Sequence, residues 1–363
     1  MSEFSAADHL HLAHALRLAE LGAWTTRPNP MVGCVIVRDG AVVGEGWHQR
    51  AGGPHAEIFA LGQAGERARG ATAYVTLEPC AHHGRTPPCA LALIEAGVAR
   101  VVAAMRDPFP QVNGGGFALL DAAGIVVQSG LMQAQARELN QGFLSRIERG
   151  RPWLRLKYGM SLDGRTAMAD GESKWITGPA ARTDVQRWRA RAGAILTGAG
   201  TVLADDPSLT VRLGRGAEYL PPLRVVLDPQ LRTLGRAKVR EGGAPTLYLH
   251  AGQVSAPALA DAEFATVPLR EDRLDLEAVL ALLAGRGVNE VQVEAGAVLG
   301  GGFLRAGLVD ELLLYQAPTL LGDGARPLLA GLGIEHMDQR LSLRLHDLRQ
   351  VGEDLRLLLR PQG

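Results

Sequence analysis

The amino-acid sequence predicts two different α/β domains, of which the first is an α/β sandwich. The chain has 363 residues, which is long for one domain and comfortable for two. Strand and helix signals alternate in both halves, and no internal repeat relates the halves. The composition changes at residues 146–152, a charged segment that contains a proline. We therefore expect one domain over residues 1–148 and a second over residues 149–363.

In the first half, Asp8 is the expected N-cap of the first helix, and two prolines within residues 27–30 require a loop. Asp39-Gly40 is a strong hairpin signal between two β-rich runs. The expected helices of this half cover residues 8–21, 55–61, 89–96 and 133–145, and the expected strands cover residues 32–37, 41–46, 73–77, 98–104 and 124–127.

In the second half, a new strand begins after the proline-containing segment, and the α/β alternation resumes. Arginines crowd a helix over residues 182–191, and a glycine-rich turn follows the strand that ends near residue 294. The expected strands cover residues 153–158, 193–197, 223–227, 246–250, 290–294 and 311–315, and a further helix covers residues 276–283.

The composition excludes several classes of protein. The hydrophobic fraction is 47%, and 38 basic residues balance 38 acidic ones, so no excess charge points to a nucleic-acid partner. Three cysteines argue against a disulfide framework and favour a reducing compartment. The N-terminus does not resemble a signal peptide, and no apolar stretch reaches the roughly 18 residues that a membrane helix needs. We expect a cytoplasmic protein with neither a membrane nor a nucleic-acid partner.

His55, Cys80 and Cys89 carry the clearest chemistry in the sequence. A neutral imidazole and two thiolates supply three zinc ligands and leave the fourth tetrahedral position for water, whose pKa zinc lowers toward about 7. Glu57 lies two residues after the histidine, where it can take the proton of that water without coordinating the metal. The order His-x-Glu, Pro-Cys and a second Cys is typical of zinc nucleobase deaminases. We expect a catalytic zinc, with each ligand at the start of a helix.

Other uses of the two cysteines stay open. They could hold a structural zinc, form a disulfide or be unpaired core thiols, and His82 or His83 could complete a closed zinc shell. The third cysteine, Cys34, lies inside an apolar run. Glu57 favours catalysis, because a structural zinc needs no carboxylate beside its histidine. Eight residues separate the two cysteines, whereas the usual deaminase spacing is two.

Segments along nearly the whole chain resemble the bifunctional deaminase/reductases of riboflavin biosynthesis, in which the eight-residue gap is the expected spacing. These segments are residues 28–34, 55–57, 77–89, 161–165, 173–177, 205–212 and 293–296. The resemblance implies a cytidine-deaminase-like domain that removes an amine from a phosphoribosylated diaminopyrimidine with Zn2+. It also implies a dihydrofolate-reductase-like domain that reduces the ribose to ribitol with NADPH. The implied partner is a phosphorylated pyrimidine, and a homo-oligomer is compatible with the sequence.

The resemblance also implies site residues. In the first domain Asn29 would contact the substrate, because an amide pairs with donors and acceptors on a pyrimidine edge, although Asn29 could be only a turn residue. His82 and Arg85 would contact the sugar or phosphate, or belong to a solvated loop. In the second domain the cofactor-binding positions are Gly159, Trp175, Thr201, Asp205, Gly296, Ala297, Val298, Leu299, Gly300, Gly301 and Gly302. The substrate-binding positions are Ser173, Arg189, Leu209, Arg212 and Glu294.

Elementary chemistry supports some of these assignments and leaves alternatives for others. Backbone amides at a glycine-rich turn bind phosphate, although the turn could be purely structural. Arg189 and Arg212 suit phosphate because a guanidinium binds two oxygens at once, although Arg189 could be a surface charge. Asp163 could be a turn former or could lie at the substrate.

Two rival functions remain compatible with the motifs. One is a zinc deaminase acting on cytidine, deoxycytidylate or a tRNA adenosine, with an unrelated second domain. The other is a zinc-stabilised module without enzymatic activity that binds a nucleotide as a regulator. The cysteine spacing and the neutral charge argue against the first rival, and Glu57 argues against the second.

Overall fold

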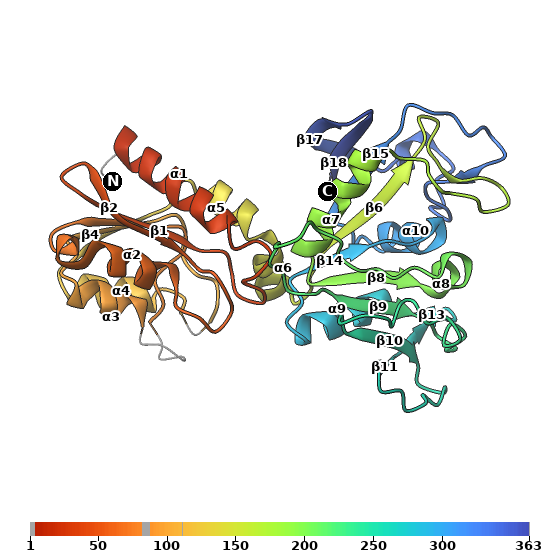
Figure 1. Ribbon diagram of the computed structural model, residues 1–363, viewed down its shortest axis with the longest axis horizontal. Helices are drawn as coiled ribbons and strands as arrows, with labels where there is room; N and C mark the ends of the chain where they lie inside the picture. The colour runs from red at the N-terminus through yellow and green to blue at the C-terminus, as the bar shows by residue number, and fades with distance from the viewer. Residues whose placement is uncertain (1–3, 82–87, 111, 363) are drawn as a thin grey trace. The chain divides into compact units, whose positions relative to one another are not determined.

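The computed structural model describes residues 4–81, 88–110 and 112–362, and the chain divides into two compact units, residues 1–150 and 151–363 (Figure 1). The expected boundary after residue 148 lies two residues before this division. Strands and helices alternate in both units, so the predicted α/β class is confirmed. Among the described residues, none of the helices combines the length and the apolar character needed to cross a membrane.

The first unit is a five-stranded sheet with helices on both faces. Its elements are α1 (Ala6–Glu20), β1 (Gly33–Arg38), β2 (Ala41–Trp47), α2 (Ala56–Ala64), the 3-10 helix η1 (Gly65–Ala68), β3 (Thr72–Val75), α3 (Cys89–Glu95), β4 (Arg100–Ala103), α4 (Gly115–Ala122), β5 (Val126–Ser129), α5 (Gln133–Leu139) and α6 (Gln141–Arg149). The strand order is β2-β1-β3-β4-β5. Strand β1 is antiparallel to both of its neighbours, whereas β3, β4 and β5 are parallel.

Alternation along β1 assigns the helices of the first unit to the two faces of its sheet. Val35 and Val37 pack with α1, α5 and α6, whereas Cys34 and Ile36 pack with α2, α3 and α4 (Figure 1). Successive side chains of a strand point to opposite faces, so a continuous apolar run buries both. The predicted sandwich is confirmed. Helices α2 and α3, which carry His55 and Cys89 at their starts, therefore lie on the same face.

Two expectations for the helices of the first unit are wrong. Ser5, not Asp8, is the N-cap of α1; the Asp8 carboxylate accepts a hydrogen bond from the Ser5 amide at 2.8 Å in a capping box. The expected helix over residues 133–145 is interrupted at Asn140 and forms α5 and α6. The Asn140 side chain accepts from the Met31 amide at 2.8 Å and donates to the Met31 carbonyl at 2.9 Å. It thus bonds to backbone outside the helix.

The hairpin at Asp39-Gly40 is confirmed, with φ of 50° and 77° at the two residues. Strand β2 then lies under α2, and two glycines make this approach close. A Cβ atom on Gly44 would lie 2.1 Å from the Ala60 carbonyl oxygen, and one on Gly46 would lie 2.5 Å from the Phe59 Cβ. Only glycine allows the backbone of α2 to rest on β2 in this way.

The second unit contains a nine-stranded sheet and two small two-stranded sheets. Its elements are β6 (Trp153–Met160), β7 (Arg165–Ala167), α7 (Pro179–Arg191), β8 (Ala194–Gly198), α8 (Ala199–Asp205), β9 (Leu223–Leu227), β10 (Thr246–Ala251), β11 (Glu263–Val267), β12 (Leu269–Arg270), β13 (Arg273–Leu274), α9 (Leu276–Gly285), β14 (Glu290–Val293), α10 (Ala297–Arg305), β15 (Glu311–Gln316), β16 (Arg326–Pro327), the 3-10 helix η2 (Met337–Gln339), β17 (Leu343–Val351) and β18 (Asp354–Pro361).

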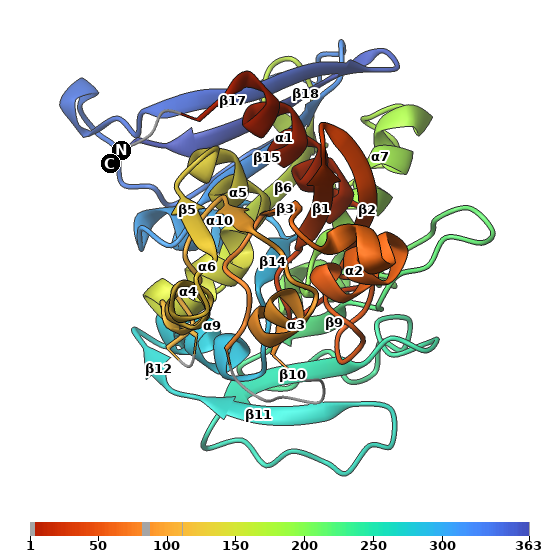
Figure 2. The same cartoon turned by 90° about the vertical axis from the view of Figure 1, so that its left-hand side faces the viewer.

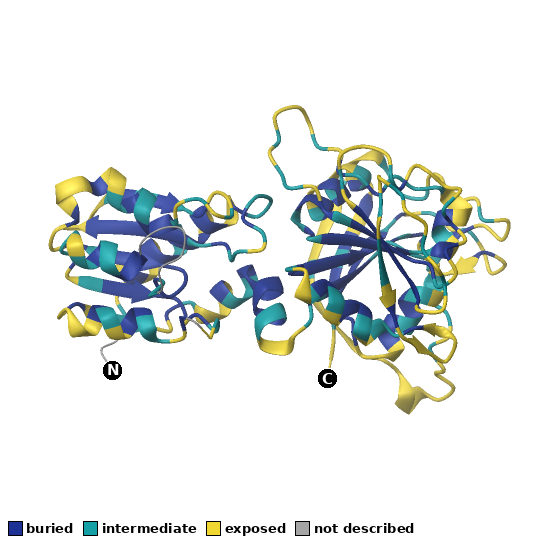
Figure 3. Ribbon diagram, turned by 90° about the horizontal axis from the view of Figure 1, so that it is seen from below, coloured by how far each residue is buried: buried dark blue, intermediate teal, exposed yellow. Residues whose placement is uncertain are grey.

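The large sheet of the second unit runs in the order β11-β10-β9-β8-β14-β6-β15-β18-β17, from one edge at β11 to the other at β17 (Figure 2). The strands from β11 to β15 are parallel, and the C-terminal hairpin adds β18 and β17 antiparallel. Helices α9 and α10 cover one face of this sheet, and α7 and α8 cover the other. In both units the central strands of the sheet are buried and the outer faces of the helices are exposed (Figure 3), whereas the edge strand β17 is largely exposed.

The contact between α2 and β2 gives a testable prediction for stability. Gly44→Ala should destabilise the first unit by about 1–3 kcal/mol, because the added methyl group overpacks against the backbone of α2. Gly62→Ala is the matched control. Gly62 lies in α2 with open space around it, so this change should stabilise by about 0.5–1 kcal/mol through helix propensity. Urea unfolding, monitored by hydrogen exchange of the α2 amides, measures the change in the free energy of unfolding for both variants. Equal effects of the two substitutions would contradict the account of the close approach.

Candidate functional site

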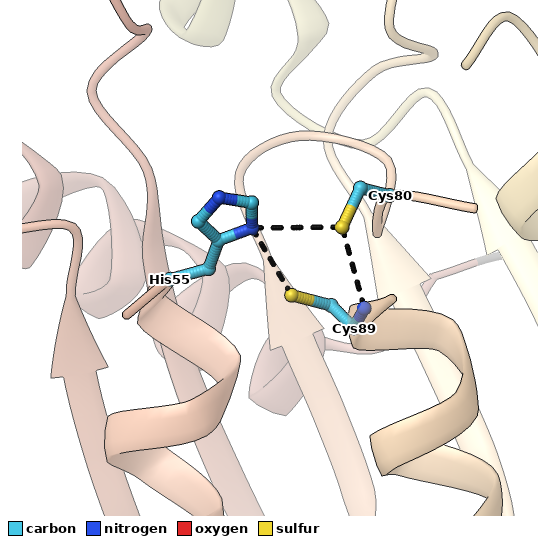
Figure 4. A group of neighbouring side chains, drawn as sticks. All are labelled: His55, Cys80 and Cys89. Carbon is cyan, nitrogen blue, oxygen red and sulfur yellow. Dashed lines mark hydrogen bonds between the residues drawn. The ribbon is translucent and has the colours of Figure 1, made fainter. Parts of the chain in front are cut away.

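His55, Cys80 and Cys89 come together at one end of the first unit's sheet (Figure 4). His55 is the N-cap of α2, and Cys89 is the first residue of α3. Cys80 lies in the loop after β3, so the expectation that every ligand starts a helix is wrong for this residue. The loop after β3 places Cys80 at the cluster, and the starts of α2 and α3 place His55 and Cys89 there.

The geometry of this cluster fits zinc. The imidazole Nδ1 of His55 lies 3.2 Å from the Cys89 Sγ and 3.5 Å from the Cys80 Sγ. A tetrahedral zinc with bonds of roughly 2.0–2.3 Å separates its ligand atoms by about 3.6 Å, so small adjustments bring all three into range. All three cysteines are free, which contradicts the disulfide alternative. Cys34 does not join the cluster, and His82, His83 and Arg85 lie outside the described residues.

The two thiols of the cluster are electrostatically unequal. The hydrogen bond from Cys89 lowers the pKa of Cys80 to about 4, and the same bond raises the pKa of Cys89 above its usual range. Cys80 is therefore the more acidic of the two thiols. A cation that replaces the shared proton would be held by two thiolates.

Glu57 lies in the first turn of α2, beside the cluster, and its side chain is 3% exposed. Burial raises the pKa of Glu57 to about 6, and the nearby His55 imidazole opposes this shift. Within the described part of the chain, Glu57 Oε2 is a buried oxygen that has no hydrogen-bond partner. A buried oxygen of this kind beside three metal ligands is available to a metal-bound water.

Asn29 is connected to the same end of the first unit by a hydrogen bond to His48, a residue that the sequence analysis missed. Its amide nitrogen lies 3.1 Å from His48 Nε2, and His48 Nδ1 lies 3.1 Å from the Pro54 carbonyl oxygen. Because that carbonyl only accepts, Nδ1 donates and Nε2 accepts from Asn29. The ring of His48 meets that of His55 edge to face, with centroids 5.4 Å apart. No motif links residues 29 and 48, so only the fold identifies His48.

The second unit contains a cleft of about 1180 Å3 at the carboxyl ends of β6, β8, β9 and β14. Ligands of open α/β sheets bind at this edge. The residues expected to bind ligand that line the cleft are Gly159, Ser173, Arg189, Thr201, Asp205, Leu209, Glu294, Gly296, Ala297, Val298, Leu299 and Gly302. Trp175, Arg212, Gly300 and Gly301 do not line it. Trp175 is 69% exposed, with the Arg182 guanidinium carbon 4.5 Å from the centre of its ring.

The expected glycine-rich turn is a helix. Gly296 is the N-cap of α10, and Gly300, Gly301 and Gly302 lie inside the helix. Two of them allow close packing: a Cβ on Gly300 would lie 1.7 Å from the Tyr158 hydroxyl, and one on Gly301 would lie 1.9 Å from the Ala330 carbonyl oxygen. The backbone amides in the first turn of α10 have no hydrogen-bond acceptor within the helix. Because this turn lines the cleft, these amides can bind an anionic group there.

Arg189 and Glu294, both expected at the substrate, bind each other. Two nitrogens of the guanidinium donate to the two oxygens of Glu294, each at 2.7 Å. Burial favours a higher pKa for Glu294, but the opposite effect of the Arg189 charge is larger, and the pKa is lowered to about 2. Arg189 is 9% exposed, so the surface-charge alternative is wrong. The guanidinium of Arg189 is thus already bound to Glu294, whereas the side chain of Arg212 is exposed.

Lys157 is a cleft residue that the sequence analysis missed. Burial lowers its pKa, and Glu294 opposes this shift. A lysine between Leu156 and Tyr158 in β6 is the signal that could have identified it, since a half-buried cation in a strand needs a reason. Asp163, in contrast, does not line the cleft. Its carboxylate accepts from the Ser161 hydroxyl within its own turn, and it accepts from the Leu321 and Gly322 amides at 3.2 and 2.8 Å, which ties this turn to residues 321–322.

The loop that carries Leu209 is held from helix α7. Leu209 has a φ of 48°, which is uncommon for a branched residue and marks a constrained position. Arg189 donates to the Thr210 carbonyl at 2.8 Å, and the Gln186 side chain accepts from the Arg212 amide at 2.9 Å. Helix α7 thus fixes the conformation of the Leu209 loop, which lines one wall of the cleft.

Known proteins resemble this chain along its whole length. The family model of the cytidine and deoxycytidylate deaminase zinc-binding region matches residues 5–105, and that of the RibD C-terminal domain matches residues 152–357. The riboflavin biosynthesis protein RibD of Escherichia coli is 50% identical over 97% of this chain and 99% of that protein. The protein of the same name from Haemophilus influenzae is 48% identical over 100% of both chains.

Solved structures agree. The structure of Acinetobacter baumannii RibD superimposes with a TM-score of 0.89 at 46% identity and covers 98% of this chain and 99% of that chain. A diaminohydroxyphosphoribosylaminopyrimidine deaminase/5-amino-6-(5-phosphoribosylamino)uracil reductase from Thermotoga maritima has a TM-score of 0.86 at 32% identity, with the same coverage.

The metal cluster gives a direct prediction. Cys89→Ser should reduce the zinc content of the purified chain from one ion to well below one, because it removes one of three ligands. Cys34→Ala is the matched control, since Cys34 is fully buried but lies outside the cluster, and it should retain one zinc. Atomic absorption on both variants measures the content. Full zinc occupancy in Cys89→Ser would contradict the assigned ligand set.

Proposed function

The chain belongs to the RibD family, the bifunctional deaminase/reductases of riboflavin biosynthesis, and we propose that residues 1–148 carry its deaminase and residues 149–363 its reductase. In the first reaction, water replaces the amine of 2,5-diamino-6-(phosphoribosylamino)pyrimidin-4-one. In the second, the ribosyl group is reduced to ribityl. The observation that carries the proposal is the unpartnered oxygen of Glu57 beside the His55–Cys80–Cys89 cluster.

In the deaminase, His55, Cys80 and Cys89 would hold zinc, which would supply an activated water and stabilise developing negative charge. Glu57 takes the proton of the water on Oε2, then passes protons to the ring nitrogen and to the departing ammonia. Its pKa of about 6 lies close to neutrality, so the carboxyl group can both accept and return a proton. Asn29 binds the pyrimidine edge and is held in place by His48.

In the reductase, the cleft would hold NADPH, which would supply the hydride for reduction of the ribosyl group. The amides of the first turn of α10 would bind its diphosphate, and Gly159, Thr201 and Asp205 line the same cleft. Glu294 and Lys157 face the substrate from β14 and β6. Arg189 supports this arrangement through its ion pair with Glu294. The exposed Arg212 binds the phosphate of the substrate.

The family's reaction is tested first at Glu57. Glu57→Gln should lower the rate of ammonia release by about 10²- to 10⁴-fold, because an amide cannot accept the proton of water. The zinc content should not change, and neither should the oxidation of NADPH with deaminated substrate. Glu66→Gln, at an exposed position just after α2, is the control and should behave as the unmodified chain. Loss of both activities together in Glu57→Gln would contradict two independent sites.

A cytoplasmic homo-oligomer completes the proposal. Three free cysteines fit a reducing compartment. In the described sheet, β17 is an edge strand whose Leu343, Leu345 and Leu348 are 38%, 51% and 52% exposed. The register shift between Leu345 and Asp347 keeps these leucines on one face, since they pair with residues 361, 359 and 357. Exposed leucines on an edge strand favour pairing with a second copy of the chain.

The oligomer is tested at the same strand. Leu345→Lys combined with Leu348→Lys should reduce the mass in solution to that of a monomer, because the charges cannot be buried against a partner. Arg344→Ala, on the other face of β17, should not change the mass. Light scattering after size-exclusion chromatography measures all three chains. An unchanged oligomer in the double variant would rule out β17 as the interface.

A further inference from the structure

The position of Cys80 needs an explanation that the other two ligands do not. His55 and Cys89 stand at the starts of helices packed on the sheet, whereas Cys80 belongs to a loop. Eight residues separate Cys80 from Cys89 in the sequence. On the N-terminal side of Cys80, Glu78 and Pro79 follow β3 and make contacts that the structure describes.

Glu78 is anchored by four backbone amides. Its side chain is 3% exposed. Oε2 accepts from the amides of Asp107 and Gly114 at 3.2 and 3.0 Å, and Oε1 accepts from those of Gly116 and Phe117 at 3.0 and 3.2 Å. A carboxylate with four N–H donors has all its strong acceptor positions filled. Glu78 thereby ties the end of β3 to the segment after β4 and to the start of α4.

The backbone beside Glu78 is also fixed. The Glu78 amide donates to the Met105 carbonyl at 3.0 Å. A Cβ atom on Gly116 would lie 1.8 Å from the Pro79 carbonyl oxygen, so the first turn of α4 rests directly on the peptide that precedes Cys80. On the other side, the Ala90 amide donates to the Cys80 carbonyl at 3.2 Å, and the Cys89 amide donates to the Cys80 Sγ at 3.3 Å. Cys80 is therefore held between α4, through Glu78, and α3.

We propose that Glu78 is a positioning residue for the metal centre. The hydrogen bonds that its carboxylate accepts from four backbone amides hold the loop so that the Cys80 thiolate lies at ligand distance from His55 and Cys89. The inference rests on the proposed zinc site. A purely structural role is the alternative, because a carboxylate at the start of α4 also stabilises that helix. The two roles differ in what happens to metal binding when stability falls.

The variant Glu78→Gln tests the proposal sharply. Each oxygen of Glu78 accepts from two amides, so the NH2 group of glutamine would face two N–H donors in either orientation. The affinity for zinc, measured on the full chain by competition with a chromophoric chelator, should fall by about 10- to 100-fold. With Co2+ in place of zinc at saturation, the thiolate-to-cobalt absorption should shift or weaken, since the Cys80 Sγ no longer holds its place.

Asp8→Asn is the matched control. Asp8 is also 3% exposed and lies in the same unit, but its side chain bonds to Ser5, Tyr74 and Arg100, away from the metal loop. This variant should lose stability and yet bind zinc with the affinity of the unmodified chain and show its cobalt spectrum. Oxidation of NADPH with deaminated substrate, which depends on the second unit, should remain intact in both variants. If Glu78→Gln does not fold, Glu78→Asp shortens the side chain but keeps its charge and should lower zinc affinity in the same direction.

The outcomes separate the claims. Unchanged zinc affinity and an unchanged cobalt spectrum in a folded Glu78 variant would overturn the positioning role while leaving the proposed function intact. Equal loss of zinc in Asp8→Asn and Glu78→Gln would also overturn it, because general destabilisation would then suffice. Absence of zinc binding by the unmodified chain would overturn the proposed function, and the inference with it.

Discussion

The feature on which both sites depend is the packing of helices against a sheet so that helix starts and strand ends meet at one edge. In the first unit, alternation along β1 puts α2 and α3 on the same face, and β3 leads into the loop that carries Cys80. His55, Cys80 and Cys89 converge only because of this arrangement. In the second unit, the carboxyl ends of β6, β8, β9 and β14 open onto the cleft beside the start of α10. Backbone amides at such an edge are available to anions and metal ligands alike.

Charges at the two sites are arranged differently, and the difference follows from the chemistry that each must support. The first unit keeps Glu57 buried and one of its oxygens unpartnered, which leaves a carboxyl group able to exchange protons near neutrality. The second unit does the opposite with Glu294, which Arg189 keeps ionised through two hydrogen bonds. A hydride transfer needs orientation more than proton exchange at this carboxylate, and a fixed ion pair orients well.

The sequence predicted most strands and the metal ligands because their signals are local: apolar alternation, Asp39-Gly40, and a histidine two residues from its carboxylate. It did not predict features that depend on distant partners. Asn140 breaks a helical pattern because its amide bonds to Met31, more than a hundred residues away. The glycine cluster of α10 predicted a turn, but it lies inside a helix, where Tyr158 and Ala330 leave no room for a side chain at Gly300 and Gly301. His48, Lys157 and Glu78 have no motif; each acquires a role only from neighbours supplied by the fold.

The central claim, that one chain carries a zinc deaminase followed by a reductase, is tested most directly by a coupled assay on the purified protein with its zinc quantified. The diaminopyrimidine phosphoribosyl substrate and NADPH are supplied together, and ammonia and the nicotinamide absorbance are followed separately. We expect one zinc in the first unit, ammonia release without delay, and NADPH oxidation that lags behind it. Oxidation of NADPH without prior ammonia release, or zinc-loaded protein that releases no ammonia, would contradict the account.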